Sequence, residues 1–456
     1  MRCNRRVRTL CVIAGIACCI GSVCANAADD NEIRVTVKRE DLPSIHISGS
    51  ITLPAGRSSG PSFDFTELKP DAIQRIVAFQ GDHEIRVETR PFSKRDSREG
   101  TGCFLPTDTA GTVRIAYDVD PTFYPPASDR ATAADARARV TGDLGVLRTT
   151  TILPQRIVAG AERIRFDLPG GWTAVTPWVE HDGAFVLGEG AGGMIPEYIG
   201  IGPISVTEFS ADEILFRVGV CVGVEGMENT SLLRVLKIER DIAACAPGAP
   251  GDIFCVIVVP RGFIRGGSSG QFSAVQPPEA VTLAHEMFHW WNTSRLIKPD
   301  ANWFHEGFTE YYGICAARDA GLIDAEFATA CFADLNAEMR YLEGDKPVSL
   351  LDASALSQRD FKMRRIVYAK GALLALLMER ELKVQGKTLN EAMASILALG
   401  RGNLSNDDLR GQFREVYGGA VDGMFNQYVL EANPLPDLEL PAATGKTGVA
   451  KYLPGK

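Results

Sequence analysis

The first part of the chain, from about residue 30 to residue 168, alternates apolar and polar residues. Runs such as residues 33–37 (IRVTV) and 113–117 (VRIAY) place an apolar side chain at every second position, and Gly, Pro, Asp and Ser separate these runs. Because successive side chains of a strand point to opposite faces, the pattern predicts strands with one buried face. We therefore expect a β-sandwich-like N-terminal domain over residues 28–168.

The pattern changes in the second half of the chain. Residues 214–222 and 253–259 are apolar runs of strand length, and residues 229–244 between them have helical periodicity. From about residue 278 to residue 432 most apolar residues recur at helical spacing, as in residues 369–382. The chain is therefore predicted to be an α+β multidomain protein whose helices are concentrated in its C-terminal part.

The first 27 residues have the composition of a secretory signal peptide. Four arginines precede an apolar stretch that ends in Ala25-Asn26-Ala27. We expect cleavage near Ala27 and an exported, periplasmic or secreted protein, with an uncleaved anchor or a lipoprotein as the alternative. The apolar stretch is shorter than a typical membrane span, and no other candidate follows it, so no integral span is expected after signal removal.

The net charge argues against one class of partner, and the cysteine spacings argue against one kind of metal site. The formal net charge is -9 and becomes more negative once the signal is removed, which argues against a nucleic-acid partner. Six cysteines follow the signal at spacings that do not form a cysteine-based zinc cluster. An even number in an exported protein permits up to three disulfides, with buried thiols as the alternative. Nothing in the sequence predicts the oligomeric state.

Residues 285–289 form an HExxH motif on a predicted helix. His285 and His289 are one turn apart on one helical face, so both imidazoles can bind a single metal ion. Zinc accepts such ligands, needs a third from the protein and leaves a fourth position for water. Glu286 can reach that water as a general base. We expect one Zn2+ per chain, and two ordinary helix histidines are the other interpretation.

The third ligand is expected in the segment 303–312 (WFHEGFTEYY), which begins a second predicted helix. Glu306 is the best candidate. Glu310 lies one turn later on the same face, and we predict that it accepts a hydrogen bond from the outer nitrogen of a ligating histidine; a solvated surface acid is the alternative. His305 is a weaker candidate ligand because it points to a different side of the helix from Glu306.

These motifs resemble the catalytic domain of the glycyl aminopeptidase family of gluzincins, the zinc metallopeptidases with HExxH and a glutamate ligand. The segments that carry the resemblance are residues 285–292, 295–299, 306–312, 349–354 and 367–374, with weaker similarity at 168–172. The resemblance implies that Glu306 is the zinc ligand and that Tyr368 helps stabilise the oxyanion. It also implies a thermolysin-like catalytic domain, expected over residues 169–325, and a C-terminal helical domain, expected over 326–436. Residues 437–456 are rich in Pro, Gly and Ala and are expected to form a loose tail.

One glycine-rich segment departs from the family pattern. Residues 265–270 (RGGSSG) contain no acid, although an exopeptidase needs a carboxylate to pair with the free amine of its substrate. Gly266 and Gly267 are candidate substrate-binding residues, because an edge strand of glycines lets a peptide backbone approach; a flexible loop is the alternative.

The sequence thus predicts a zinc peptidase that hydrolyses peptide bonds through a metal-activated water, aminopeptidase-like by resemblance, with a peptide or protein as its substrate. A weakly active, zinc-bound scaffold that binds peptides is one alternative. A broader alanyl-type aminopeptidase or an endopeptidase is the other.

Overall fold

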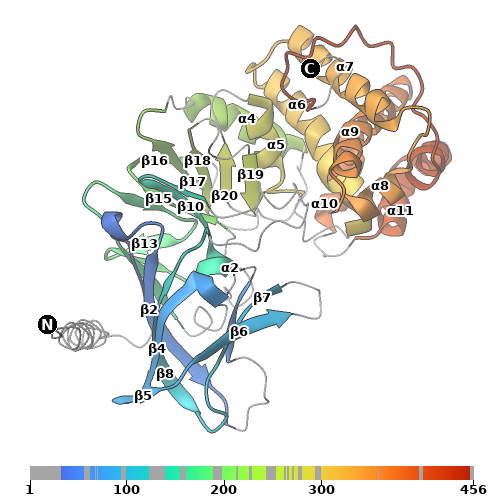
Figure 1. Cartoon of the computed structure of the whole chain (residues 1–456). Coiled ribbons are helices and arrows are strands. Elements are labelled where there is room, and N and C mark those ends of the chain that lie inside the picture. The colour runs from blue at the N-terminus through green and yellow to red at the C-terminus, as the bar shows by residue number, and fades with distance from the viewer. Residues whose placement is uncertain are drawn as a thin grey trace, which may run out of the picture. The chain divides into compact units, whose positions relative to one another are not determined.

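A computed structural model gives the fold of the chain (Figure 1). It describes residues 32–451 apart from 56–61, 67, 69, 94–98, 123–138, 155–160, 188–197, 212–213, 225–228, 243–252, 261–262, 264–265, 270–271, 276–279, 293–298, 358 and 400–403. The signal peptide predicted for residues 1–27 lies outside the described residues.

The described residues form two compact units. The first contains the described residues up to 174 and those from 178 to 202, and the second contains residues 175–177 and those from 203 onward. The first unit therefore runs past the expected boundary at residue 168, because strand β15 (Tyr198–Gly202) pairs with β10 (Leu144–Arg148). The domain bounds expected from the sequence, 28–168, 169–325 and 326–436, stay predictions.

The first unit is built from three sheets. Their strand orders are β13-β14-β11-β1-β2-β8-β4-β5, β12-β15-β10-β9 and β3-β7-β6. The remaining bounds are β1 (Glu32–Thr36), β2 (Ile45–Leu53), β3 (Phe63–Thr66), β4 (Ile73–Gln80), β5 (His83–Ile85), β6 (Glu88–Ser93), β7 (Glu99–Phe104), β8 (Gly111–Val119), β9 (Arg139–Thr141), β11 (Arg163–Asp167), β12 (Thr173–Val175), β13 (Val179–His181) and β14 (Ala184–Val186). A short helix, α2, spans Thr149–Ile152.

Alternation along these strands separates core from solvent, as the sequence predicts. In β1 the side chains of Ile33 and Val35 are fully buried, and the residues between them are partly exposed. Strand β1 pairs with β11 in parallel and with β2 in antiparallel fashion, which places it inside the largest sheet. Tyr117 in β8 is buried, and its hydroxyl donates to the carbonyl of Ile152 at 2.7 Å, so the polar end of this core residue is satisfied.

The second unit contains a five-stranded sheet of order β16-β17-β18-β20-β19. Its strands are β16 (Ile204–Ala211), β17 (Ile214–Cys221), β18 (Ile253–Val258), β19 (Gly266–Ser269) and β20 (Phe272–Val275). Strands β17, β18 and β20 are parallel, and every residue of β18 is buried, as expected for a central parallel strand. Strand β19 is antiparallel to β20 and lies at the edge of the sheet.

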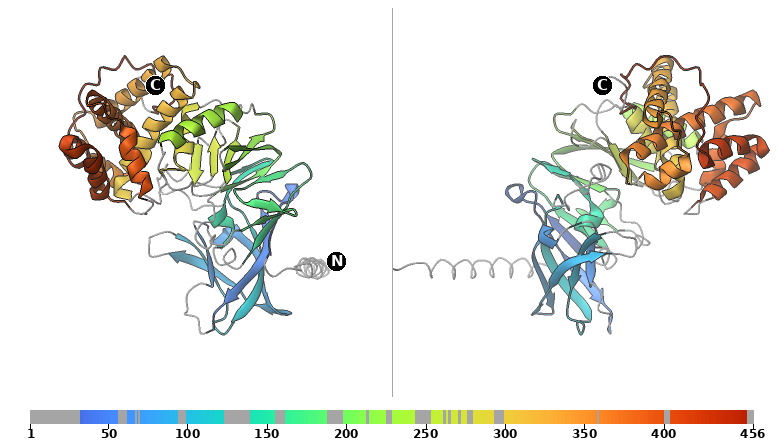
Figure 2. Two further views of the ribbon diagram at one scale, coloured as in Figure 1. Left: turned by 180° about the vertical axis from the view of Figure 1, so that it is seen from behind. Right: turned by 45° about the vertical axis from the view of Figure 1, so that its right-hand side comes forward.

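Helices make up most of the rest of the second unit (Figure 2). They are α4 (Asn229–Ile242), α5 (Ala280–Phe288), α6 (Thr309–Asp319), α7 (Ala325–Glu343), α8 (Leu350–Leu356), α9 (Phe361–Val384), α10 (Leu389–Ala398), α11 (Asn406–Tyr417) and α12 (Asp422–Met424). Carboxylate or hydroxyl side chains cap several of them: Asp324 caps α7, Ser349 caps α8 and Asp360 caps α9. These helices enclose one hydrophobic core, which includes Trp303, Phe304 and Leu373.

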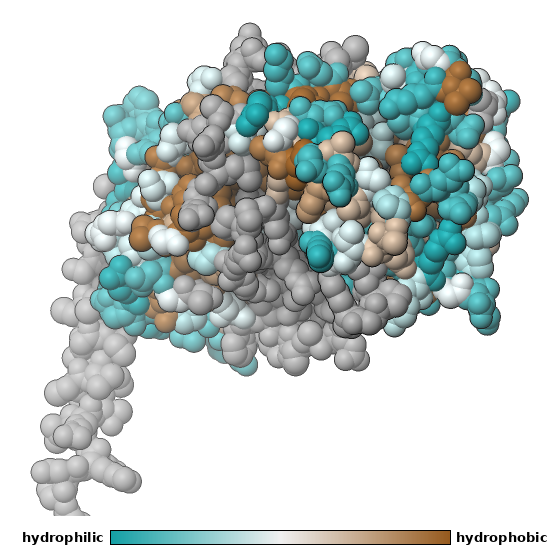
Figure 3. Space-filling view, turned by 90° about the horizontal axis from the view of Figure 1, so that it is seen from above, coloured by the Kyte–Doolittle hydropathy of each residue, from teal (hydrophilic) through white to brown (hydrophobic). Residues whose placement is uncertain are grey.

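The fold class predicted from the sequence is confirmed: the chain is α+β, with a β-rich N-terminal part and a helical C-terminal part. Among the described residues, no helix combines the length and apolarity needed to cross a membrane. Five cysteines (103, 221, 255, 315 and 331) are buried free thiols. The space-filling view shows a mixed surface on which hydrophilic residues alternate with smaller hydrophobic patches (Figure 3).

Candidate metal centre

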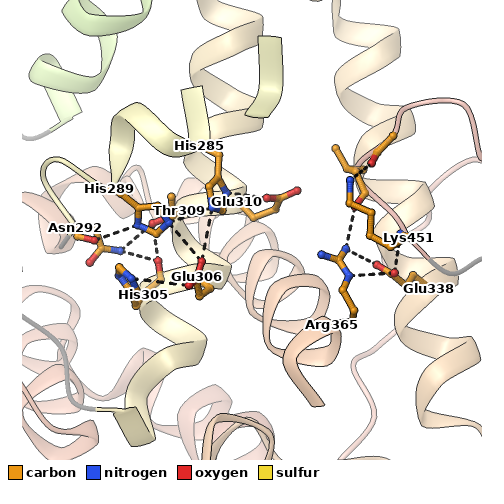
Figure 4. Close-up of polar contacts among 12 residues, drawn as sticks. His285, His289, Asn292, His305, Glu306, Thr309, Glu310, Glu338, Arg365 and Lys451 are labelled. Carbon is orange, nitrogen blue, oxygen red and sulfur yellow. Dashed lines mark hydrogen bonds and ion pairs between the residues drawn. The ribbon is translucent and has the colours of Figure 1, made fainter. Parts of the chain in front are cut away.

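The structure brings together the three side chains predicted to bind a metal (Figure 4). His285 lies on α5 and His289 directly follows its last residue, and their Nε2 atoms are 3.1 Å apart. Oε2 of Glu306 lies 3.7 Å from Nε2 of His285 and 3.4 Å from Nε2 of His289. All three side chains are largely buried, with exposed fractions of 7%, 9% and 16%.

Nε2 of His285, Nε2 of His289 and Oε2 of Glu306 form a triangle whose size fits a zinc ion. Three atoms at these separations have an equidistant point about 2.0 Å from each, which is the length of zinc–nitrogen and zinc–oxygen bonds. Without a cation between them, these three atoms contact one another unfavourably. Two neutral imidazole nitrogens can share only one hydrogen, and Oε2 of Glu306 is buried without a hydrogen-bond partner. A cation between the three atoms would satisfy them together, so the donor set fits a zinc ion.

The electrostatics of the cluster also favour a cation. Burial alone would raise the pKa of Glu306, but the neighbouring imidazoles of His285 and His289 hold it well below its usual range, so the carboxylate is ionised. Burial lowers the pKa of His285, yet Glu306, Glu310 and Glu286 together raise it to about 10. The surrounding carboxylates therefore stabilise positive charge where the predicted ligands meet.

The outer nitrogens of both imidazoles face polar partners. Nδ1 of His285 lies 2.8 Å from Oε2 of Glu310, which is nine-tenths buried and on helix α6. Nδ1 of His289 lies 3.3 Å from the backbone carbonyl of Asn292. Such partners fix the ring orientation, so that Nε2 of each imidazole faces the position where a metal ion would bind. Glu310 is thus placed as predicted, and the solvated surface acid considered as its alternative does not match its burial.

A π-helical turn, Trp303–Phe308, carries Glu306 and leads into α6. Turns of this kind are uncommon and recur at functional sites. The side chain of Asn292 fixes the turn, because its amide donates to the carbonyl of His305 and to Oγ1 of Thr309, both at 3.1 Å. Sequence reasoning missed Asn292 and Thr309. The only signal in the sequence was that both are polar residues inside or next to the two segments that carry the candidate ligands.

Glycines set the distances between the helices that form the site. A Cβ on Gly307 would lie 2.5 Å from Cα of Gly371, so the π-helical turn and α9 touch backbone to backbone. A Cβ on Gly313 would lie 2.9 Å from Cα of His285, so α6 packs closely on α5. Any larger residue at either position would force the backbones apart. These contacts were not anticipated from the sequence.

Tyr368 and Glu286 both lie beside the ligand cluster. The ring of Tyr368 stacks on the imidazole of His285, with 5.7 Å between centroids and 8° between planes, and its hydroxyl makes a side-chain hydrogen bond with Glu306. Burial and the charge of Glu306 raise the pKa of Tyr368 well above its usual value, so the phenol stays protonated. Glu286 is half-buried, and its charge acts on both His285 and Tyr368.

His305 is close to the cluster but outside the triangle. Its Nε2 is 3.9 Å from Oε1 of Glu306, and its ring centroid is 4.4 Å from that of His289. Burial and the nearby His289 lower its pKa to about 3, so the imidazole is neutral.

Gly266 and Gly267 belong to β19, the edge strand of the five-stranded sheet, and α5 packs on β19 and β20. The edge strand expected at this position is therefore present beside the metal-binding helix. The role of the two glycines in binding a substrate stays a prediction.

Comparisons with known proteins agree with this geometry. Residues 279–374 match the M61 glycyl aminopeptidase family. No curated protein matches the chain. The structure resembles an aminopeptidase N family protein from Idiomarina loihiensis, with a TM-score of 0.69, 16% identity, and coverage of 89% of this chain and 76% of that one.

Two crystal structures from Deinococcus radiodurans are also similar. An M1 zinc metallopeptidase has a TM-score of 0.59 and 17% identity, with coverage of 90% of this chain and 95% of that one. A mutant of an M1 zinc metallopeptidase from that organism, bound to a Tyr-Ser-Ala substrate, has a TM-score of 0.59, 16% identity and the same coverage. At these identities the likeness shows a common fold. Residues 279–374, which hold every candidate metal ligand, match the glycyl aminopeptidase family, and the predicted resemblance of the chain to these gluzincins is confirmed.

Proposed function

We propose that the chain is a zinc-dependent peptidase of the aminopeptidase type, with His285, His289 and Glu306 as metal ligands. The observation that carries the proposal is the triangle of Nε2, Nε2 and Oε2, whose sides of 3.1, 3.4 and 3.7 Å match the ligand spacing around zinc. The match of residues 279–374 to a peptidase family gives independent support.

Each further residue has a role that follows from its position. A bound zinc ion would supply a Lewis acid that polarises the scissile carbonyl and makes water more acidic. Glu286 follows the first ligand on α5 and is half-buried, so its carboxylate is available to take a proton from the attacking water and pass it to the leaving amine. Tyr368 keeps its proton and is available to donate a hydrogen bond to the oxyanion.

The peptide substrate would approach along the edge of the sheet. Strand β19 is antiparallel to β20 and has no further strand beside it among the described residues, so its outer backbone groups are free to pair with an extended peptide. Gly266 and Gly267 place no Cβ between the strand and such a peptide. The tripeptide held by the similar metallopeptidase from Deinococcus radiodurans is consistent with a substrate of this class.

Measurements of bound zinc and of peptide hydrolysis on the same samples test the proposal. The wild-type protein should bind one zinc per chain and release products from a mixed peptide pool. Glu286→Gln should keep its zinc and lose at least about 100-fold in kcat, because the general base is removed while the ligands remain. A wild-type protein that holds zinc and cleaves no peptide would instead be a peptide-binding scaffold.

The absence of an acid in residues 265–270 leaves two modes of cleavage to separate. An aminopeptidase pairs the free amine of its substrate with a carboxylate, so acetylation of the substrate should abolish cleavage. An endopeptidase cleaves free and acetylated peptides at similar rates. The comparison of kcat/KM for one peptide in both forms therefore assigns the mode, and the family match favours dependence on the free amine.

A further inference from the structure

The C-terminal residues Thr444–Lys451 lie against α7, and Asp334 of that helix binds the first part of this segment. Asp334 accepts hydrogen bonds from the backbone N–H groups of Thr444 and Gly445 at 2.7 and 2.8 Å, and from the hydroxyl of Thr447 at 2.7 Å. We call residues 444–451 the C-terminal strap. Their composition predicts a loosely packed tail, yet Val449 is buried in the main hydrophobic core.

One turn along α7, the strap meets a buried ion pair (Figure 4). Glu338 is fully buried and accepts the backbone N–H of Lys451 at 2.7 Å. Its carboxylate also forms a two-pronged contact with Arg365 of α9, at 3.2 Å to Nε and 2.7 Å to Nη2. The same Nη2 donates to the carbonyl of Val449 at 2.9 Å. The strap therefore accepts one of the hydrogen bonds that Arg365 donates.

Arg365 connects this cluster to the metal centre. It lies three residues before Tyr368 on α9, so the two side chains share a helix face. Its guanidinium carbon is 5.2 Å from the centre of the Tyr368 ring, and that ring stacks on His285.

From these contacts we propose that the C-terminal strap is part of the active centre. Strap contacts hold Arg365, and Arg365 acts as a positioning residue that fixes the phenol of Tyr368 beside the metal ligands. The proposal rests on the proposed peptidase function, because the positioned group is the donor to the oxyanion. Lysine would not replace Arg365, since a point charge cannot make the two-pronged contact with Glu338 while reaching Val449.

Two variants and their combination test this coupling. Asp334→Asn replaces Oδ2, which accepts from the backbone N–H and the hydroxyl of Thr447, by an N–H donor, and so weakens the attachment of the strap without touching the ligands. We expect it to lower kcat about tenfold through misplacement of the phenol. Tyr368→Phe removes the phenol hydroxyl and should lower kcat about 100-fold. In the Tyr368→Phe background, Asp334→Asn should change kcat less than twofold, because the group it positions is already absent.

Controls separate positioning from general damage. Zinc content should stay at one per chain in every variant, and Glu326→Gln, which changes an exposed acid on the same helix, should leave kcat unchanged. Arg365→Lys should show the same loss as Asp334→Asn. Equal losses of kcat from Asp334→Asn in both backgrounds, or no loss in either, would overturn the proposal.

A readout that does not need activity distinguishes failure of the strap from failure of the proposed function. Hydrogen exchange of a peptide spanning residues 361–370 should speed up in Asp334→Asn and stay at the wild-type rate in Glu326→Gln. A wild-type protein that cleaves no peptide refutes the peptidase function. Unchanged exchange at residues 361–370 refutes the strap, whatever the activity.

Discussion

Gly307 is the position where one added methyl group should do most damage to the proposed centre. A Cβ added there would lie 2.5 Å from Cα of Gly371 and 2.9 Å from the carbonyl oxygen of Val367, and both atoms are backbone. Ordinary van der Waals contact begins at 3.4 Å. In Gly307→Ala the π-helical turn and α9 must therefore separate by about 1 Å, a shift large enough to disturb catalysis.

That shift acts on the two residues next to the contact. Glu306 precedes Gly307, and Tyr368 follows Val367, so the ligand carboxylate and the phenol would move apart together. Overpacking of this kind costs about 1–3 kcal/mol of unfolding free energy. A displacement of about 1 Å at reacting groups lowers kcat on the order of 100-fold, which corresponds to about 2.7 kcal/mol of activation free energy.

The assay compares Gly307→Ala with Gly411→Ala for stability, bound zinc and kcat. Gly411 lies inside helix α11 with open space where a Cβ would be. Alanine there should stabilise the protein by up to about 1 kcal/mol and leave kcat unchanged. If Gly307→Ala bound zinc and turned over substrate like the wild-type protein, the glycine contact would not set the geometry of the centre.

Three further changes probe the surroundings of the centre. Glu310→Gln should weaken zinc binding by about 10–100-fold in competition with a chelator, because it removes the charge that orients His285; an unchanged affinity would count against this role. Asn292→Ala should lower the unfolding free energy by about 1–3 kcal/mol in denaturant titration, since the turn loses two hydrogen bonds and the carbonyl of His305 keeps only the one from the hydroxyl of Thr309; the reasoning fails if the midpoint does not move. Burial would raise the pKa of Asp334, but its hydrogen bonds from Thr447, Gly445 and Thr444 lower it below 3.8. Its contribution to strap docking is therefore complete above pH 3.8 and is lost as the pH falls through the lower pKa of the folded state. The hydrogen-exchange protection of residues 444–451, measured relative to the intrinsic rate at each pH, should fall over that acidic range in the wild-type protein and be low throughout in Asp334→Asn.

The residues of the candidate metal centre could be found in the sequence because their signal is local. The spacing of His285 and His289 places both on one helical face, whereas the assignment of Glu306, which lies on a π-helical turn, also needed the family resemblance. The strands β17 and β18 and the helix α4 were predictable for the same reason, and the structure confirms them within two residues at their ends.

Long-range contacts account for what the sequence did not reveal. The pairing of β15 with β10 joins segments about fifty residues apart, and alternation along a strand does not identify its partner. The approach of Gly307 to Gly371 depends on how two helices cross. A glycine within a helical pattern does not show which other helix it will contact. The docking of residues 444–451 was hidden by a Gly- and Thr-rich composition that is also typical of loose tails.

The contacts that fix the ligand-bearing turn and the contacts that dock the C-terminal strap join residues at very different separations along the chain. Asn292 and Thr309, which fix the ligand-bearing turn, are 17 positions apart, whereas Asp334 and Thr444 are 110 apart. The longer segment is itself folded into helices, so detachment of residues 444–451 leaves it intact, whereas separating Asn292 from Thr309 opens the turn that carries Glu306. We therefore expect thermal loosening to free the C-terminal segment before it separates the three ligands. Protein in which this segment has detached would keep its bound metal ion but no longer hold the phenol of Tyr368 in place. The measured number of metal ions per chain is therefore an upper bound on the fraction of catalytically competent protein.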